Sequence, residues 1–175
     1  PETTITRLAY LDKNSQQIIF NPRDSQEIFY EENSVLYSLK NSRVQTIIGG
    51  LIAYQFSGEN IVWLSSEGIL RLSDASGKLI NGLSEKRFNV NSDKKYELLL
   101  MAGKTFLREN NLLFSFNPDA KVFENFYAPD GDYEVLDSPD NKNLFFCNGD
   151  KIYLYSFLDE KNVQYLPAGI NGPVK

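Results

Sequence analysis

The sequence predicts an all-β protein that repeats a four-stranded unit, and three observations support this prediction. The chain of 175 residues is 13% aromatic, with 10 Tyr and 12 Phe, and such residues favour strands over helices. Turn residues recur between short apolar runs. The phrase Asn-Pro-Arg-Asp at Asn21–Asp24 returns in similar form at Ser138–Asn141, three periods of about 39 residues later. Such repetition is typical of units that bury their apolar faces only by stacking on neighbours.

The predicted unit is the blade of a β-propeller, a four-stranded antiparallel meander whose first strand lies nearest the central axis. The first blade, over residues 16–49, is predicted to have strands at Gln17–Phe20, Glu27–Glu32, Val35–Lys40 and Val44–Ile48. Asn33-Ser34 and Asn41-Ser42 supply turns, and Gly49-Gly50 ends the blade.

The second blade, over residues 50–84, follows the same pattern. Its predicted strands are Leu51–Gln55, Asn60–Ser65, Gly68–Ser73 and Lys78–Leu83. Ser57-Gly58 is the first turn, and the segment Asp74–Lys78 is a tight polar hairpin of the type that separates the outer strands of a blade.

The third blade, over residues 86–127, is the least regular. Its predicted strands are Arg87–Asn91, Tyr96–Met101, Leu112–Phe116 and Lys121–Phe126. The stretch Ala102–Asn110 is in excess of the pattern and is predicted as a long hairpin or a protruding loop. A helix over Lys94–Arg108 is an alternative, but Lys94 and Lys95 stand at the wrong end for the helix dipole, so a strand is preferred.

The fourth blade, over residues 132–167, completes the predicted set. Its strands are Tyr133–Asp137, Asn143–Cys147, Lys151–Phe157 and Asn162–Leu166. An extra strand is predicted at Ile5–Leu11, and all four blades are assigned to one domain over residues 1–175. The extra strand leaves two arrangements open, namely a small closed ring of four blades or part of a ring of six to eight.

The phrase before the second strand of the fourth blade resembles a known repeat. Ser138–Lys142, read Ser-Pro-Asp-Asn-Lys and followed by Leu144–Phe146, is similar to the Ser-Pro-Asp-Gly-Lys of WD40-like repeats of the TolB type. Asn141 stands where the family has glycine, and Asn tolerates the left-handed conformation. The resemblance implies a propeller used for protein binding, in a bacterial envelope or surface setting. It carries over no defined functional residue.

The composition excludes several classes of function. The net charge is −5 and Lys and Arg are scattered, which argues against binding of nucleic acid. The chain has no histidine, so neither a Ser-His-Asp triad nor an imidazole metal site can form from it alone. No apolar run is long enough to predict a membrane span. Cys147 is the only cysteine and is predicted to be a buried, unreactive side chain.

Two segments resemble binding motifs without matching them. The run Gly103-Lys104-Thr105 follows an apolar stretch, but Leu98 occupies the place of the earlier glycine that a phosphate-binding loop needs. Asp130, Asp132 and Glu134 are the only candidates for a cation site, because calcium prefers oxygen ligands. A solvated turn is the preferred interpretation of these acids, and no cofactor is expected.

The sequence therefore predicts a noncatalytic propeller that binds or scaffolds a protein or peptide through loops at one mouth of the ring. Two alternatives involve enzymes: an accessory or gating propeller of a larger enzyme, and a carbohydrate-active propeller that uses Asp and Glu. A further alternative is a homodimer in which a second copy completes the ring.

Overall fold

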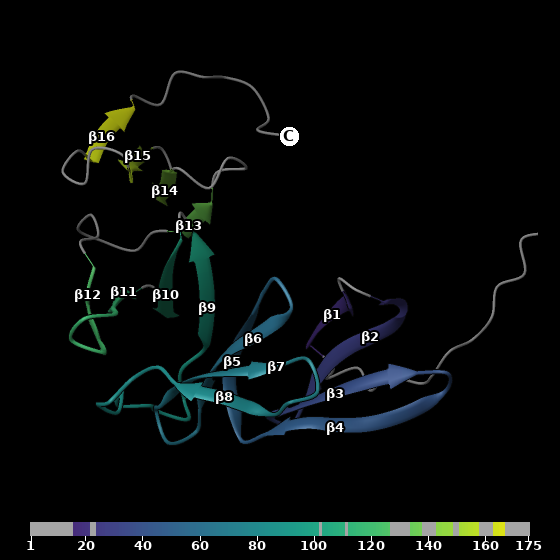
Figure 1. The fold of residues 1–175 in the computed structure, drawn as a ribbon. Helices are drawn as coiled ribbons and strands as arrows, with labels where there is room; N and C mark the ends of the chain where they lie inside the picture. The colour runs from purple at the N-terminus through teal and green to yellow at the C-terminus, as the bar shows by residue number, and fades with distance from the viewer. Residues whose placement is uncertain are drawn as a thin grey trace, which may run out of the picture. The chain divides into compact units, whose positions relative to one another are not determined.

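The computed structural model describes residues 16–21, 24–101, 103–110, 112–126, 134–137, 143–148, 151–157 and 163–166. These residues contain sixteen strands and no helix. The strands form four antiparallel four-stranded sheets, each built from strands consecutive in the chain. The chain divides into two compact units, Pro1–Val90 and Asn91–Lys175, with two sheets each (Figure 1).

The first sheet has the order β1-β2-β3-β4. Its strands are β1 (Gln16–Asn21), β2 (Asp24–Glu32), β3 (Val35–Lys40) and β4 (Arg43–Gly49), which confirms the four strands predicted here. Both inner turns consist of two residues with positive φ: 52° and 62° at Asn33 and Ser34, and 50° and 60° at Asn41 and Ser42. This geometry matches the right-handed twist of the flanking strands.

The second sheet follows after one residue, Gly50. It contains β5 (Leu51–Ser57), β6 (Asn60–Ser65), β7 (Leu70–Asp74) and β8 (Leu79–Gly82), each of which overlaps a predicted strand. Leu51 N donates to Ser34 O at 3.0 Å, and Ser66 N donates to Gly50 O at 2.7 Å. The first bond ties the start of the second sheet to the β2–β3 turn of the first, and the second bond holds Gly50 against the β6–β7 turn.

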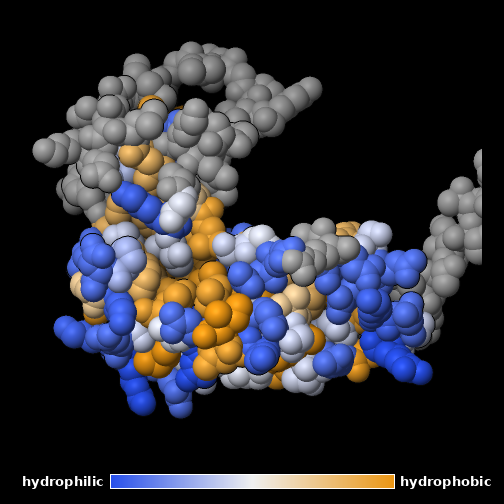
Figure 2. Space-filling view, in the orientation of Figure 1, coloured by the Kyte–Doolittle hydropathy of each residue, from blue (hydrophilic) through white to orange (hydrophobic). Residues whose placement is uncertain are grey.

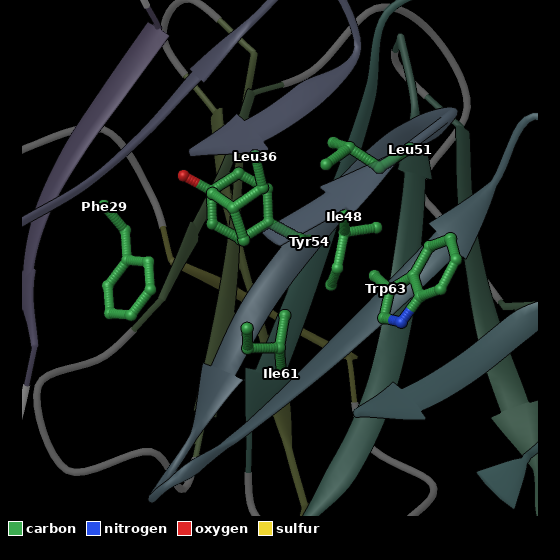
Figure 3. Packing of buried hydrophobic residues seen from close by; sticks show 7 residues of the cluster. All are labelled: Phe29, Leu36, Ile48, Leu51, Tyr54, Ile61 and Trp63. Atoms are coloured by element: carbon green, nitrogen blue, oxygen red, sulfur yellow. The ribbon is translucent and has the colours of Figure 1, made fainter. Parts of the chain in front are cut away.

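The core of the first unit lies between its two sheets (Figure 3). Its buried members are Phe29, Leu36 and Ile48 from the first sheet and Leu51, Tyr54, Ile61 and Trp63 from the second. Phe29 and Ile61 are 0% exposed. Trp63 Nε1 donates to Ser73 Oγ at 3.0 Å, so the buried indole N–H is satisfied. In β6 the two core residues, Ile61 and Trp63, alternate along the strand, so both side chains point toward the first sheet.

The third sheet corrects the sequence prediction. It contains β9 (Tyr96–Met101), β10 (Lys104–Glu109), β11 (Leu112–Asn117) and β12 (Val122–Asn125). The strand predicted at Arg87–Asn91 is wrong, because these residues form no strand. The second strand is instead β10, which lies in the stretch predicted as a long hairpin or a protruding loop and forms a hairpin with β9. The alternative helix over Lys94–Arg108 is wrong.

The physical reason lies in the polar residues of β10. Phe106 and Leu107 are each 0% exposed, but charged residues surround them in sequence and hide the strand pattern. Glu109 is only 6% exposed. It accepts a hydrogen bond from Tyr96 Oη at 2.8 Å and forms an ion pair with Lys94 Nζ at 3.0 Å. Buried charges are tolerated when they are paired in this way.

The fourth sheet contains β13 (Glu134–Asp137), β14 (Asn143–Asn148), β15 (Lys151–Ser156) and β16 (Val163–Leu166). The core of the second unit joins it to the third sheet through Met101, Phe106, Leu113, Leu144, Phe146 and Tyr155. The extra strand predicted at Ile5–Leu11 lies outside the described residues. The assignment of residues 1–175 to one domain and the number of blades in a closed ring stay predictions.

Figure 2 shows both hydrophobic and hydrophilic residues on the face of the molecule that it draws. Among the residues that the structure describes, the exposed large apolar side chains are Ile18, Phe20, Val44, Leu79, Ile80 and Leu112. Three of them belong to the first sheet. Ile19 packs against the core, so its neighbours Ile18 and Phe20 point to the opposite face. Val44 shares that face through the paired residues Leu39 and Ile28. We call it the outer face of the first sheet.

Candidate functional site

Three chain segments of the first unit meet at one end of its strands. In an antiparallel meander, the connections from odd to even strands all lie at the same end of the sheet. The end of β1, the β5–β6 turn and the β7–β8 turn therefore stand together. They enclose a pocket of about 250 Å³, which is lined by Asn21, Phe56, Glu59, Asn60, Asp74, Ala75 and Ser76.

The polar part of the pocket is ordered by the β7–β8 turn. Asp74 Oδ1 accepts hydrogen bonds from the Ser76 hydroxyl at 2.6 Å, from Ser76 N at 2.9 Å and from Lys78 N at 3.0 Å. These bonds, with that of the Ser76 hydroxyl the strongest influence, hold the pKa of the Asp74 carboxyl below its ordinary value. On the other side, Asn21 Nδ2 donates to Glu27 Oε2 at 2.7 Å.

The apolar part of the pocket continues into the core. The Phe56 ring lies 5.0 Å from the Phe29 ring and 6.1 Å from the Tyr54 ring, between centroids. Ala75, at the tip of the β7–β8 turn, also packs against the core. The pocket therefore combines a fixed aromatic ring with a rim of oxygen atoms.

A close backbone approach holds the β7–β8 turn against the first sheet. Gly77 has φ +83°, and a Cβ atom placed on it would lie 2.1 Å from the carbonyl oxygen of Ile47 in β4. Only glycine fits a position that needs both a left-handed backbone and such proximity. The shape of the pocket thus depends on a residue outside its lining.

The carboxylates and the aromatic ring suit a cationic or hydrogen-bond-donating group. A metal ion would require several ligand side chains grouped together. Within the part of the chain that the structure describes, no three His, Cys, Asp or Glu side chains are grouped so that they could hold one.

The residues predicted as a cation site are not brought together by described structure. Asp130 and Asp132 lie outside the described residues. Glu134 begins β13, where its backbone pairs with Cys147. Cation binding by these acids stays a prediction. Cys147 is partly buried in β14.

The segment compared with a phosphate-binding loop is a β-hairpin. Leu98 lies in β9 and Thr105 lies in β10, and these two strands pair antiparallel. A phosphate-binding loop instead connects a strand to a helix, whose N-terminus faces the phosphate. The structure therefore offers no such cradle at Gly103.

Sequence reasoning did not find the pocket residues. The turns Ser57-Gly58 and Asp74–Lys78 were identified, but as connections between strands. Their convergence on Asn21 depends on how the first two sheets stack, and single-strand patterns do not report stacking. The sequence could have indicated the site through one topological rule, which is that alternate hairpin turns of a meander lie at the same end of the sheet.

Acid titration tests the hydrogen-bonded state of Asp74. The folded-state pKa of Asp74 is lowered from its ordinary value of 3.8. The hydrogen bonds to the ionised carboxylate therefore stabilise the turn fully at pH values above 3.8. That stabilisation is lost as the pH falls through the folded-state pKa. NMR titration of the Asp74 carboxyl carbon should give a midpoint below 3.8, and Ser76→Ala should raise it. A wild-type midpoint at or above 3.8 would contradict this assignment.

The fold defines an all-β protein of propeller-like, four-stranded sheets. No protein-family model matches the sequence, and no curated protein matches it. In the described ranges, no helix is long and apolar enough to cross a membrane.

Two solved structures share the fold. The computationally designed Ika8 protein matches with a TM-score of 0.55 and 9% identity, over 87% of this chain and 48% of that chain. The dihydro-heme d1 dehydrogenase NirN, in complex with DHE, matches with a TM-score of 0.53 and 16% identity, over 90% of this chain and 37% of that chain. This chain thus spans less than half of each matched chain, and the similarity concerns the fold alone.

Proposed function

We propose that this protein is a noncatalytic propeller of the WD40-like, TolB type that binds a protein or peptide at the pocket between its β1, β5–β6 and β7–β8 ends. The pocket is the observation that supports this function. Its loops stand on two rigid sheets, and rigid scaffolds with binding loops are a common design for recognition.

The pocket favours a peptide with a basic side chain. The alkyl stem of a Lys or Arg would lie along Phe56 and Ala75, and its charged head would meet the carboxylates of Asp74 and Glu59. The aromatic ring adds an attraction for the same cation. This chemistry also agrees with the net charge of −5.

The state of Asp74 favours binding over acid–base catalysis. A carboxyl group that acts as a general acid near neutral pH needs a raised pKa, whereas hydrogen bonds lower that of Asp74. The chain also lacks histidine. We therefore prefer a binding module to a carbohydrate-active propeller built on this pocket.

The repeat type is supported by the place of the repeated phrases in the fold. Ser138–Lys142 directly precedes β14, and Asn21–Asp24 spans the start of β2. β2 and β14 are each the second strand of their sheet. In the TolB-type repeat, the Ser-Pro-Asp-Gly-Lys phrase introduces this second strand.

A displayed library of 12-residue peptides tests this function. Peptides enriched on the wild-type protein should contain Lys or Arg, and Glu59→Lys should weaken their binding at least tenfold, about 1.4 kcal/mol. Glu67→Lys is the matched control, because it makes the same charge reversal in the β6–β7 turn, at the opposite end of the sheet. Failure to enrich peptides, or equal losses in both variants, would contradict the proposal.

A further inference from the structure

One aromatic position recurs in the second strands of three sheets. It is occupied by Phe29 in β2, Phe106 in β10 and Phe145 in β14. The Phe29 ring lies 5.0 Å from the Phe56 ring of the following sheet. The Phe106 ring lies 5.6 Å from the ring of Phe157, which directly follows β15 of the following sheet. Both Phe29 and Phe106 are 0% exposed. A phenylalanine at this position therefore packs against an aromatic ring of the next sheet in the chain.

Phe145 has the same orientation in the last sheet of the described residues. Its neighbours Leu144 and Phe146 pack against the third sheet, so Phe145 points to the opposite face of the fourth sheet. Its side chain is only partly buried. In the described part of the chain, no fifth sheet follows β13–β16.

The first sheet carries the matching acceptor position. In the second sheet, Phe56 pairs with Ile61 and receives Phe29 from the preceding sheet. In the first sheet, Phe20 pairs with Ile28 at the equivalent place. Phe20 is 66% exposed. Ile18 and Val44, each 55% exposed, flank it on the same outer face, although Tyr30 and Leu39 near the middle of that face are buried.

We propose that a second copy of this chain covers the outer face of the first sheet, with its Phe145 packed against Phe20 as Phe29 packs against Phe56. The donor and acceptor positions belong to one sequence, so two copies are complementary without a further partner. The two solved chains compared above also extend over more than twice the length aligned with this chain. Two copies of this chain supply eight described sheets.

The oligomeric state of the 175-residue chain tests the proposal. Sedimentation velocity should show a species of twice 20.0 kDa, and Phe20→Asp should weaken its self-association at least tenfold, because it places a charge in an apolar contact. The exposed position of Phe20 makes the variant compatible with folding. Leu79→Asp is the matched control, because Leu79 is 53% exposed on β8 and should leave association unchanged. A monomer at all concentrations, or a dimer indifferent to Phe20→Asp, would overturn the proposal.

Crosslinking identifies the partner face. In a Cys147→Ser background, chains with Phe20→Cys are mixed with chains carrying Phe145→Cys and treated with a short bis-maleimide. A covalent product of two chains that forms only in the mixture supports the contact. A third variant carries both Phe20→Cys and Phe145→Cys in one chain. If this variant crosslinks within the chain and the mixture gives no product of two chains, the chain's own fourth sheet covers the face, which would overturn the proposal. The test is independent of the peptide-binding function, because neither position lines the pocket.

Discussion

Phe29→Ala is expected to lower the free energy of unfolding of the first unit by about 3–5 kcal/mol, which is the usual loss when a buried phenylalanine is truncated. Phe29 is 0% exposed, and its ring joins the first sheet to Phe56 of the second. The substitution removes apolar contacts from both sheets and leaves a cavity between them. Urea unfolding followed by tryptophan fluorescence measures the effect locally, because Trp63 is the only tryptophan and belongs to this core.

The matched control for Phe29→Ala is Leu79→Ala. Leu79 is also a large apolar residue of the first unit, but it is 53% exposed, so its truncation should cost less than about 0.5 kcal/mol. Similar losses in the two variants would mean that Phe29 does not fill the interface between the sheets. A changed slope of the unfolding free energy with urea would indicate altered compactness rather than lost packing.

Gly77→Ala is expected to destabilise the first unit by more than about 3 kcal/mol, through two separate costs. The left-handed backbone costs any residue with a Cβ atom about 1–2 kcal/mol. The new methyl group would also lie 2.1 Å from the Ile47 carbonyl oxygen, so the β7–β8 turn must move away from β4. Because this turn carries Asp74 and Ser76, the pocket should be distorted as well.

Gly58→Ala separates the two costs. Gly58 also has a positive φ, +59°, but a Cβ atom there would meet nothing within 4 Å. Its substitution should cost only the backbone term of about 1–2 kcal/mol. Urea unfolding of both variants gives the difference, which measures the close approach to Ile47. If the two losses are equal, the approach at Gly77 does not determine the stability of the unit.

The sequence predicted most strands because their local patterns agree with the fold. In the first sheet, apolar alternation in β2 and β3 and the Asn-Ser turns all indicate one hairpin. β10 was not predicted as a strand, because the burial of Glu109 depends on contacts with Lys94 and Tyr96, which lie in another segment. A local pattern cannot report an ion pair that tertiary structure creates.

The pocket was beyond prediction for a related reason. Each lining residue belongs to an ordinary turn or strand end, and Asp74-Ala75-Ser76 is explained by hairpin geometry alone. What makes the site is the stacking of one sheet on another, together with the approach of Gly77 to Ile47. The sequence shows that glycine is present but not what lies beside it.

The single residue between the first two sheets also limits where this protein can accept insertions. β4 ends at Gly49, β5 begins at Leu51, and Gly50 is fixed by its φ of +69° and by the hydrogen bond that its carbonyl accepts from Ser66. An insertion at this joint would displace a whole sheet. We therefore expect insertions to be tolerated better at the hairpin tips than at this joint, and two of those tips are the turns that line the pocket.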